Sequence, residues 1–316
     1  GPGELDAQPI LSGLQAIVVS PEGEEGWYAD WYNNGAYGTP EWESYILDEV
    51  IPQITARYKI LPQRRYHALL GISMGGLGAA YLGGRLPGFF GSIGAMSGFV
   101  DLQIAPDIVS VAMDGLSGVP SGSIIGPENG FYATGHNPTA LVENLQYTRV
   151  FLSAGNGVPT PPDGSGGGVG NAEEAGVIRP MEDAYDDALK AAGINVTYQT
   201  HNGCHCWPDF QDELRSVVAW GLFKPVVSNP ADWTNQTVAT HGQLWDIGYS
   251  FTKHPNAVVR FKQTGDRLQI SAAGTPVTIT TTGKCVLHLA TPSTVRLPTK
   301  SCVRTKARHK KKRKHH

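Results

Sequence analysis

The pentapeptide Gly71-Ile72-Ser73-Met74-Gly75 constrains the fold more than any other stretch of the chain. It follows the apolar run Tyr66–Leu70 and precedes Leu77–Leu86, which is rich in small residues. In a G-x-S-x-G sequence the serine occupies a sharp, strained turn between a strand and a helix, and the glycines leave room for that turn. The context therefore predicts a strand, a tight turn and a helix, with Ser73 as a nucleophile. The alternative is a glycine-rich turn in a non-catalytic α/β protein.

Apolar runs and helical spacing alternate along the first 225 residues. The predicted strands are Leu14–Ser20, Tyr66–Leu70, Phe90–Met96, Arg149–Ala154 and Ile194–Gln199. The predicted helices are 41–59, Leu77–Leu86, Met181–Ala192 and Asp209–Phe223, and residues 155–172 are expected to form a Gly/Pro loop. Strands that alternate with helices indicate a mostly parallel sheet with helices on both faces.

The pattern changes after about residue 225. Residues 226–303 show short alternating stretches such as Val258–Lys262 and Val277–Thr280, which predict antiparallel strands. We therefore expect an α/β domain over 1–225, a small β-rich accessory domain over 226–303 and a basic, disordered tail over 304–316.

The net charge of −3 conceals an uneven distribution. Residues 304–316 carry eight basic and no acidic side chains, so the rest of the chain has 17 basic and 28 acidic ones, a balance of −11. Such a tail favours binding to an anionic cell-surface polymer or membrane, and the alternative is a solvated tail without a partner. The acidic body argues against nucleic acid as a partner.

The four cysteines form two local pairs, Cys204/Cys206 and Cys285/Cys302. A disulfide between Cys285 and Cys302 would suit an exported protein, although four cysteines allow three connectivities. Zinc is the competing reading, but Cys204-His205-Cys206 packs ligands more tightly than a usual zinc finger. We expect neither a metal nor a cofactor. The chain also has no apolar run long enough for a membrane helix, no initiator Met and no signal peptide.

A serine nucleophile needs a base and an acid, which follow it along the chain in the order serine, acid, histidine. His205 lies between the last predicted strand of the α/β part and its final helix, and His201 is the runner-up. The acid must lie between Arg149–Ala154 and His205. Asp163, Glu173 and Glu174 lie in or beside the expected loop, where a carboxylate can reach a histidine.

Five motifs occur in an order that resembles the esterase family of secreted mycolyltransferases and esterase-D-like carboxylesterases. They are Trp27–Tyr32 (WYADWY), the serine pentapeptide, Gly94–Gly98 (GAMSG), Gly155–Pro159 (GNGVP) and Gly203–Trp207 (GCHCW). The resemblance covers roughly residues 14–222. It implies an α/β-hydrolase fold, acyl-ester chemistry and an exported protein. It also implies Ser73 as nucleophile, His205 as base and Glu174 as acid, with Glu173 close behind.

The chain departs from the family pattern in two places. One is the cysteine on each side of His205, and the other is the start of the chain, because family members usually have several strands ahead of the one expected at Leu14–Ser20. One donor for the oxyanion, the Met74 backbone N–H, is available, whereas the family's second donor comes from a loop in that upstream region. A substrate pocket is expected to include Trp27, Asp30, Trp31 and Trp207, although ordinary core packing explains the aromatic rings equally well.

Three functions follow from these residues. The first is a serine carboxylic-ester hydrolase, in which Ser73 forms an acyl-enzyme that water hydrolyses. The second is an acyltransferase of the mycolyltransferase type, in which a sugar hydroxyl replaces water. The third is a non-catalytic cell-surface-binding protein. The first two would act on an ester or acyl-sugar substrate, and each of the three would be secreted or associated with the cell envelope.

Overall fold

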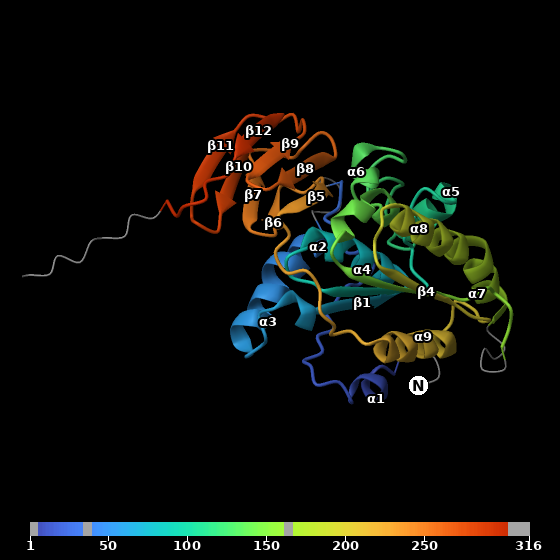
Figure 1. Cartoon of the computed structure of the whole chain (residues 1–316). Coiled ribbons are helices and arrows are strands. Elements are labelled where there is room, and N and C mark those ends of the chain that lie inside the picture. Colours follow the sequence, from blue (N-terminus) through green and yellow to red (C-terminus); the bar gives the residue numbers. More distant parts are fainter. Residues whose placement is uncertain (1–5, 34–39, 161–166, 303–316) are drawn as a thin grey trace, which may run out of the picture.

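The computed structural model describes residues 6–33, 40–160 and 167–302, and it contains one parallel and two antiparallel sheets (Figure 1). The parallel sheet has the order β1-β2-β3-β4. Its strands are β1 (Ala68–Ile72), β2 (Ser92–Met96), β3 (Arg149–Ala154) and β4 (Val196–Thr200). The predicted α/β-hydrolase fold with additional C-terminal β structure is confirmed.

Helices cover both faces of the parallel sheet (Figure 1). Val150 and Leu152 of β3 pack in the core that α4 and α8 share, whereas Phe151 between them packs against α9 on the opposite face. Successive strand side chains point to opposite faces, and this strand is buried on both, so it is apolar throughout. The α-helices are α1 (Gln8–Leu11), α2 (Trp42–Ser44), α3 (Ile51–Arg57), α4 (Met74–Arg85), α5 (Pro106–Ser110), α6 (Phe131–Thr134), α7 (Gly167–Glu173), α8 (Arg179–Ala191) and α9 (Trp207–Trp220).

The parallel register brings the carboxyl ends of the four strands to one edge of the sheet. Ile72 of β1 pairs with Met96 of β2, and Met96 pairs in turn with Ser153 of β3. The segments that leave these strands therefore start beside one another, which is the usual place for a binding site in an open α/β sheet. Ser73 and Ser97 are the first residues beyond β1 and β2.

The C-terminal β region consists of two four-stranded sheets, ordered β11-β10-β7-β6 and β12-β9-β8-β5. Its strands are β5 (Asp232–Thr237), β6 (His241–Leu244), β7 (Ile247–Phe251), β8 (Val259–Thr264), β9 (Arg267–Ile270), β10 (Val277–Thr281), β11 (Val286–Leu289) and β12 (Ser293–Arg296). Alternate residues of β8 are buried and exposed, as a strand with one solvated face requires. A Cys285–Cys302 disulfide closes the end of this region. The domain boundaries at 225 and 303 stay predictions.

The predicted strand at Leu14–Ser20 is wrong. The segment is irregular, and the side chains of Ile17, Val18 and Val19 are 41–55% exposed. A strand needs a partner for its backbone groups, and β1 ends the described sheet order without one on its outer side. The loop expected at 155–172 is also shorter than predicted, because α7 begins at Gly167. No helix among the described residues is long and apolar enough to cross a membrane.

Candidate active site

The turn between β1 and α4 holds Ser73 in a strained conformation, with φ 56° and ψ −120°. A Cβ on Gly71 would lie 1.7 Å from the Gly75 carbonyl oxygen, and one on Gly76 would lie 2.7 Å from the Gly98 Cα. A Cβ on Gly75 would meet nothing closer than 3.7 Å. The steric demand therefore falls on Gly71 and Gly76, not on both glycines of the pentapeptide as the sequence suggested.

A continuous line of hydrogen bonds runs from this serine to a buried carboxylate. Ser73 Oγ lies 2.7 Å from His205 Nε2, and His205 Nδ1 lies 2.8 Å from Glu174 Oε2. The other oxygen of Glu174 accepts the Gly155 N–H at 2.7 Å and the Ser97 hydroxyl at 2.8 Å. Because the Glu174 side chain is fully buried, these donors take the place of water around its charge.

Among the described residues, the other predicted acid, Glu173, and the other predicted base, His201, have contacts unlike those of Glu174 and His205. Glu173 Oε1 is 3.9 Å from His205 Nε2, and its side chain is 37% exposed. His201 Nε2 lies 2.9 Å from Glu213 Oε1, so this ring is directed to a different carboxylate. Asp163 lies outside the described residues. The geometry thus brings together Ser73, His205 and Glu174.

Met74, which was expected to supply an oxyanion donor, is the first residue of α4. The first N–H groups of a helix have no partner within the helix, so this N–H is available beside the serine. The side chain of Met74 packs against the core that α4 shares with α8.

Two more carboxylates are buried beside Glu174. Burial raises the pKa of Glu182 well above its usual range, although Glu182 accepts the Gly98 N–H at 2.9 Å. Burial also raises the pKa of Glu213 to about 7. The hydrogen bond to Glu213 raises the pKa of His201 to about 9, so this histidine is a cation at neutral pH.

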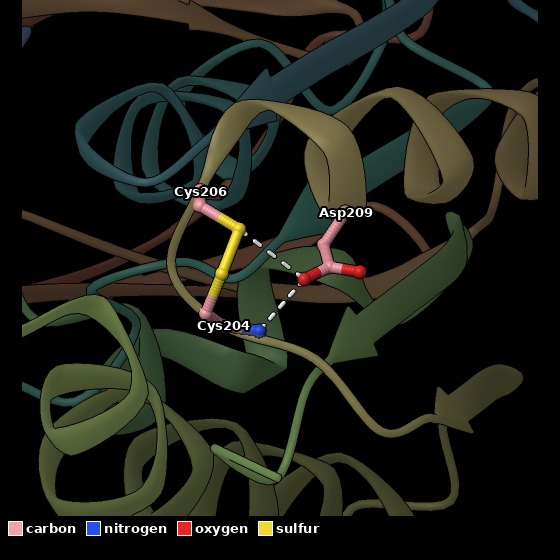
Figure 2. A group of neighbouring side chains, drawn as sticks. All are labelled: Cys204, Cys206 and Asp209. Carbon is pink, nitrogen blue, oxygen red and sulfur yellow. Dashed lines mark hydrogen bonds between the residues drawn. A yellow bond between two sulfur atoms is a disulfide. The ribbon is translucent and has the colours of Figure 1, made fainter. Parts of the chain in front are cut away.

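A disulfide joins the two cysteines that flank the histidine (Figure 2). Asp209 in the first turn of α9 accepts the Cys204 N–H at 2.7 Å through Oδ2, which lies 3.3 Å from Cys206 Sγ. Each of the three residues offers an atom that could bind a metal, and these atoms lie within 4.8 Å of one another. Both sulfurs, however, are bonded to each other, whereas the sulfur that binds zinc is a thiolate.

The predicted substrate residues are spread over different surroundings. Trp27 is 3% exposed and packs edge-on against Phe99, with ring centroids 5.4 Å apart. Trp31 packs against the same core, and its indole N–H donates to the Gly26 carbonyl at 3.2 Å. Both tryptophans therefore have structural contacts that account for their presence. Asp30 accepts the Ser44 N–H at 3.0 Å and the Ser44 hydroxyl at 2.5 Å.

Trp207 differs from the other three, because it is 41% exposed. Its ring lies edge-on to the Phe210 ring, and the ring centroids of Phe210 and His205 lie 4.8 Å apart. Trp207 therefore combines an exposed side chain with a link, through the Phe210 ring, to the imidazole of His205.

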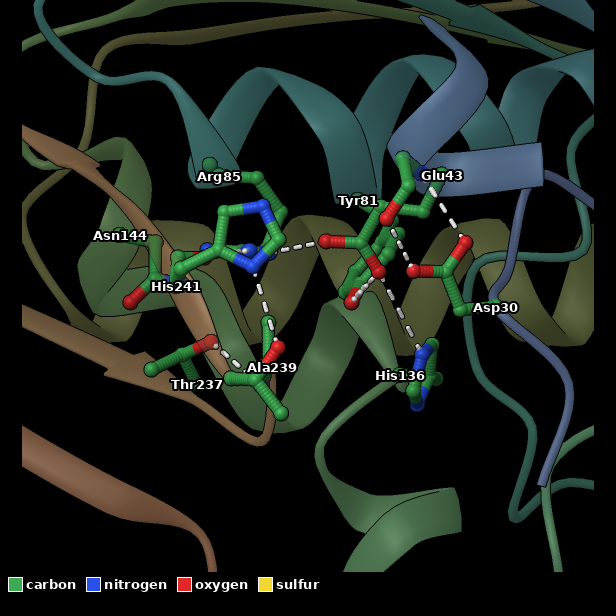
Figure 3. Close-up of polar contacts among 12 residues, drawn as sticks. Asp30, Glu43, Tyr81, Arg85, His136, Asn144, Thr237, Ala239 and His241 are labelled. Atoms are coloured by element: carbon green, nitrogen blue, oxygen red, sulfur yellow. Dashed lines mark hydrogen bonds and ion pairs between the residues drawn. The ribbon is translucent and has the colours of Figure 1, made fainter. Parts of the chain in front are cut away.

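A second cluster of buried charges joins the parallel-sheet part to the β region (Figure 3). Arg85 forms an ion pair with Glu43, and it donates to the Tyr249 hydroxyl at 2.9 Å and to the His241 carbonyl at 3.2 Å. A cleft of about 350 Å³ is lined by residues of both parts, including Asp30. Asp30 therefore lies on this cleft, and none of the contacts described for it reaches Ser73.

Sequence reasoning missed three residues around the acid. Ser97 and Gly155 lie in motifs that carried the family resemblance, but neither spacing nor residue type indicated that they bind a carboxylate. Glu213 lies within α9 beside Asp212, and acidic residues in such a helix are usually solvated charges. Only its side chain's 0% exposure in the structure reveals the difference.

The chain is similar to known proteins both in sequence and in fold. Residues 10–220 match the family described as "Putative esterase". The diacylglycerol acyltransferase/mycolyltransferase Ag85A of Mycobacterium leprae is 28% identical over 212 residues, which are 64% of this chain and 63% of that protein. Ag85A of Mycobacterium tuberculosis H37Rv is 30% identical over 206 residues, or 63% of this chain and 58% of that protein. The chain thus spans about three fifths of the length of these relatives.

Two solved structures show the same fold. Mycobacterium tuberculosis MPT51 (FbpC1) aligns with a TM-score of 0.56 and 22% identity over 69% of this chain and 82% of its own. The serine hydrolase FphF of Staphylococcus aureus aligns with a TM-score of 0.54 and 16% identity over 70% of this chain and 76% of its own. The family match covers most of the chain, and the relatives are enzymes of the family that its motifs resemble. The chain therefore belongs to the esterase family of α/β-hydrolase-fold enzymes.

Proposed function

We propose that the chain is a serine carboxylic-ester hydrolase that acts through an acyl-enzyme on Ser73. One observation carries the proposal: Ser73, His205 and the buried Glu174 form an unbroken line of hydrogen bonds. A serine, a histidine and a carboxylate in this arrangement make up the catalytic triad of many hydrolases. The strained turn at Ser73 and the family membership support the same assignment.

In the proposed reaction, His205 Nε2 takes the Ser73 proton as the oxygen attacks the ester carbonyl carbon. The Met74 N–H donates to the oxyanion that forms. Glu174 fixes the tautomer of the neutral His205 ring and stabilises the imidazolium that the ring becomes. His205 then gives its proton to the leaving alcohol as the carbon–oxygen bond breaks. Water, deprotonated by His205, attacks the acyl carbon. The bond from this carbon to Ser73 Oγ breaks, His205 returns the proton to Ser73 Oγ, and the acid is released. We propose that the exposed ring of Trp207 contacts the substrate beside the histidine.

Labelling with a fluorophosphonate tests the proposal, because the reagent reacts with an activated serine. We expect stoichiometric labelling of the full chain, loss of labelling in Ser73→Ala, and wild-type labelling in Ser216→Ala, a half-buried serine on α9 whose hydroxyl donates to the Asp212 carbonyl. The absence of labelling in the folded wild-type chain would instead favour a non-catalytic surface-binding protein.

An acyltransferase is the second candidate, because the curated relatives named above are acyltransferases. The same three residues would act, and a sugar hydroxyl would attack the acyl-enzyme in place of water. A product assay with an activated ester, with and without a sugar acceptor, separates the two reactions. Free acid as the only product at every acceptor concentration would exclude transfer to that acceptor.

We also propose that the protein is secreted or held at the cell envelope, where it binds an anionic polymer. Two disulfides support an oxidising location. The segment 304–316, with eight basic residues, lies outside the described part of the chain. Strands β8, β9 and β12 add exposed Arg260, Lys262, Arg267 and Arg296. We expect the protein to be retained on an anionic polysaccharide, and we expect added salt to weaken this retention. Deletion of 304–316 should abolish it.

A further inference from the structure

One serine hydroxyl joins Glu174 to a second buried carboxylate. Ser97 Oγ lies 2.8 Å from Glu174 Oε1 and 3.0 Å from Glu213 Oε1. The side chains of both glutamates are fully buried. A hydroxyl has a single hydrogen, so Ser97 can donate to only one of the two carboxylates at a time. The state of Glu213 therefore affects how Glu174 is held.

Glu213 is bonded in turn to a histidine on the loop that carries His205. Its Oε1 accepts the Ser153 hydroxyl at 3.0 Å and lies 2.9 Å from His201 Nε2. His201 precedes His205 by four residues, in the connection between β4 and α9. Glu213 is thus linked to Glu174 through the Ser97 hydroxyl, and to the loop that carries His205 through His201.

The geometry also defines the protons of this pair. His201 Nδ1 lies 2.9 Å from the Asn202 carbonyl oxygen, which can only accept, so Nδ1 carries a hydrogen. A second proton lies between Nε2 and Glu213 Oε1. At neutral pH this proton belongs to His201, whose pKa of about 9 exceeds the pKa of about 7 of Glu213. Between about pH 7 and about pH 9 the pair is therefore an imidazolium beside a carboxylate.

Other acidic groups surround the pair. Glu174, at the start of the π-helical segment Glu174–Ile178 that follows α7, and Glu182 from α8 face the same buried space, and Asp209 of α9 acts on His201. Among the groups that act on Glu213, the His201 imidazolium is the cation. Without it, Glu213 and Glu174 would be two like charges within reach of one hydroxyl, which disfavours the ionised form of both.

We propose that His201 and Glu213 form a positioning pair for the active site, which fixes the Ser97 hydroxyl and the histidine loop so that Glu174 and His205 keep their alignment. Neither residue touches the reacting atoms. Glu213 bonds Ser97, which contacts Glu174, and His201 lies on the loop that carries His205. This inference rests on the proposed function, because it concerns the same site.

Two variants that nearly keep the side-chain shape test the pair, His201→Gln and Glu213→Gln. We expect each to lower kcat for a p-nitrophenyl ester about tenfold with KM changed less than about twofold, since a hydrogen bond to a charged group is lost away from the substrate. Because the two residues act together, the double variant should be no slower than the slower single variant. Asp212→Asn, which removes an exposed charge from the same helix, is the matched control and should behave as wild type.

The pH profile separates this role from a merely structural one. The imidazolium is present below the raised pKa of His201 and is lost as pH rises through it. The wild-type kcat/KM should therefore decline above about pH 9, and both variants should lack this alkaline limb. Wild-type kcat in both variants, or an unchanged alkaline limb in both, would overturn the proposal.

A measurement on the wild-type protein keeps the test independent of how the variants fold. With ¹⁵N-labelled histidine, both ring nitrogens of His201 should be protonated at neutral pH, and a neutral ring would overturn the proposal. Fluorophosphonate labelling of Ser73 reports separately on the proposed function. Labelled protein with a neutral His201 would reject the pair alone, whereas failure of labelling would reject the hydrolase.

Discussion

Arg85 connects the last turn of α4 to the β region, and its removal leaves a buried charge without its partner. Its guanidinium bonds the Glu43 carboxylate, the Tyr249 hydroxyl and the His241 carbonyl, and the residue is 3% exposed. Arg85→Met keeps an apolar stem of similar length but no charge. Breaking a buried ion pair by removal of one partner costs about 3–5 kcal/mol, and we expect the free energy of unfolding to fall by this amount.

The same pair makes stability depend on pH. Burial alone would raise the pKa of Glu43, but Arg85, His136 and Tyr81 lower it to about 2. A carboxylate whose pKa is lowered on folding stabilises the protein above its unfolded pKa, and this contribution disappears as pH falls from about 4.5 to about 2. The shift from 4.5 to about 2 corresponds to about 3 kcal/mol. The difference between wild type and Arg85→Met should therefore shrink in acid.

Urea unfolding followed by tryptophan fluorescence, at about pH 7 and about pH 3.5, measures both effects. The control is Arg57→Met at an exposed site on α3, for which we expect a change within about 0.5 kcal/mol. The double variant Glu43→Gln/Arg85→Met should recover part of the loss, because it buries no unpaired charge. A loss below about 1 kcal/mol in Arg85→Met, or an equal loss at both pH values, would refute this reasoning.

Three further results are expected. Gly76→Ala should lower the free energy of unfolding by about 1–3 kcal/mol, because the new Cβ would lie 2.7 Å from the Gly98 Cα. Gly75→Ala should be nearly neutral, because no atom lies within 3.7 Å of its new Cβ, and equal thermal midpoints for the two variants would contradict this. Glu174→Gln should slow ester hydrolysis by ~10²–10⁴-fold, because the His205 imidazolium loses its carboxylate. Glu173→Gln should hydrolyse the ester at the wild-type rate, and similar rates in the two variants would count against Glu174 as the acid. Deletion of 304–316 should leave the rate of ester hydrolysis unchanged while polymer binding is lost, and retained binding would assign that role to another surface.

Local rules were sufficient for much of the parallel-sheet part. The strand at Arg149–Ala154 could be predicted because it is apolar and buried on both faces, and the structure has it at the same bounds. The strand, turn and helix around Ser73 could be predicted because G-x-S-x-G demands them. Chain order then selected His205, which the structure brings within hydrogen-bonding distance of the serine.

The remaining features depend on contacts that the sequence does not encode locally. Leu14–Ser20 has the apolar content of a strand, but pairing requires a neighbour that periodicity cannot supply. Glu173 and Glu174 are adjacent, and neighbours on a helix differ by about 100° in direction, so only the three-dimensional fold could separate them. Glu213 reads as a surface charge until the burial of its side chain is seen.

The Cys204–Cys206 disulfide places His205 inside a covalent ring in the connection between β4 and α9. Oxidation of these two thiols therefore changes the covalent structure of the loop that carries the proposed base. Preparations made under reducing and oxidising conditions would therefore differ covalently on both sides of His205. Each rate measured for this protein should therefore be reported together with the number of free thiols in the same preparation.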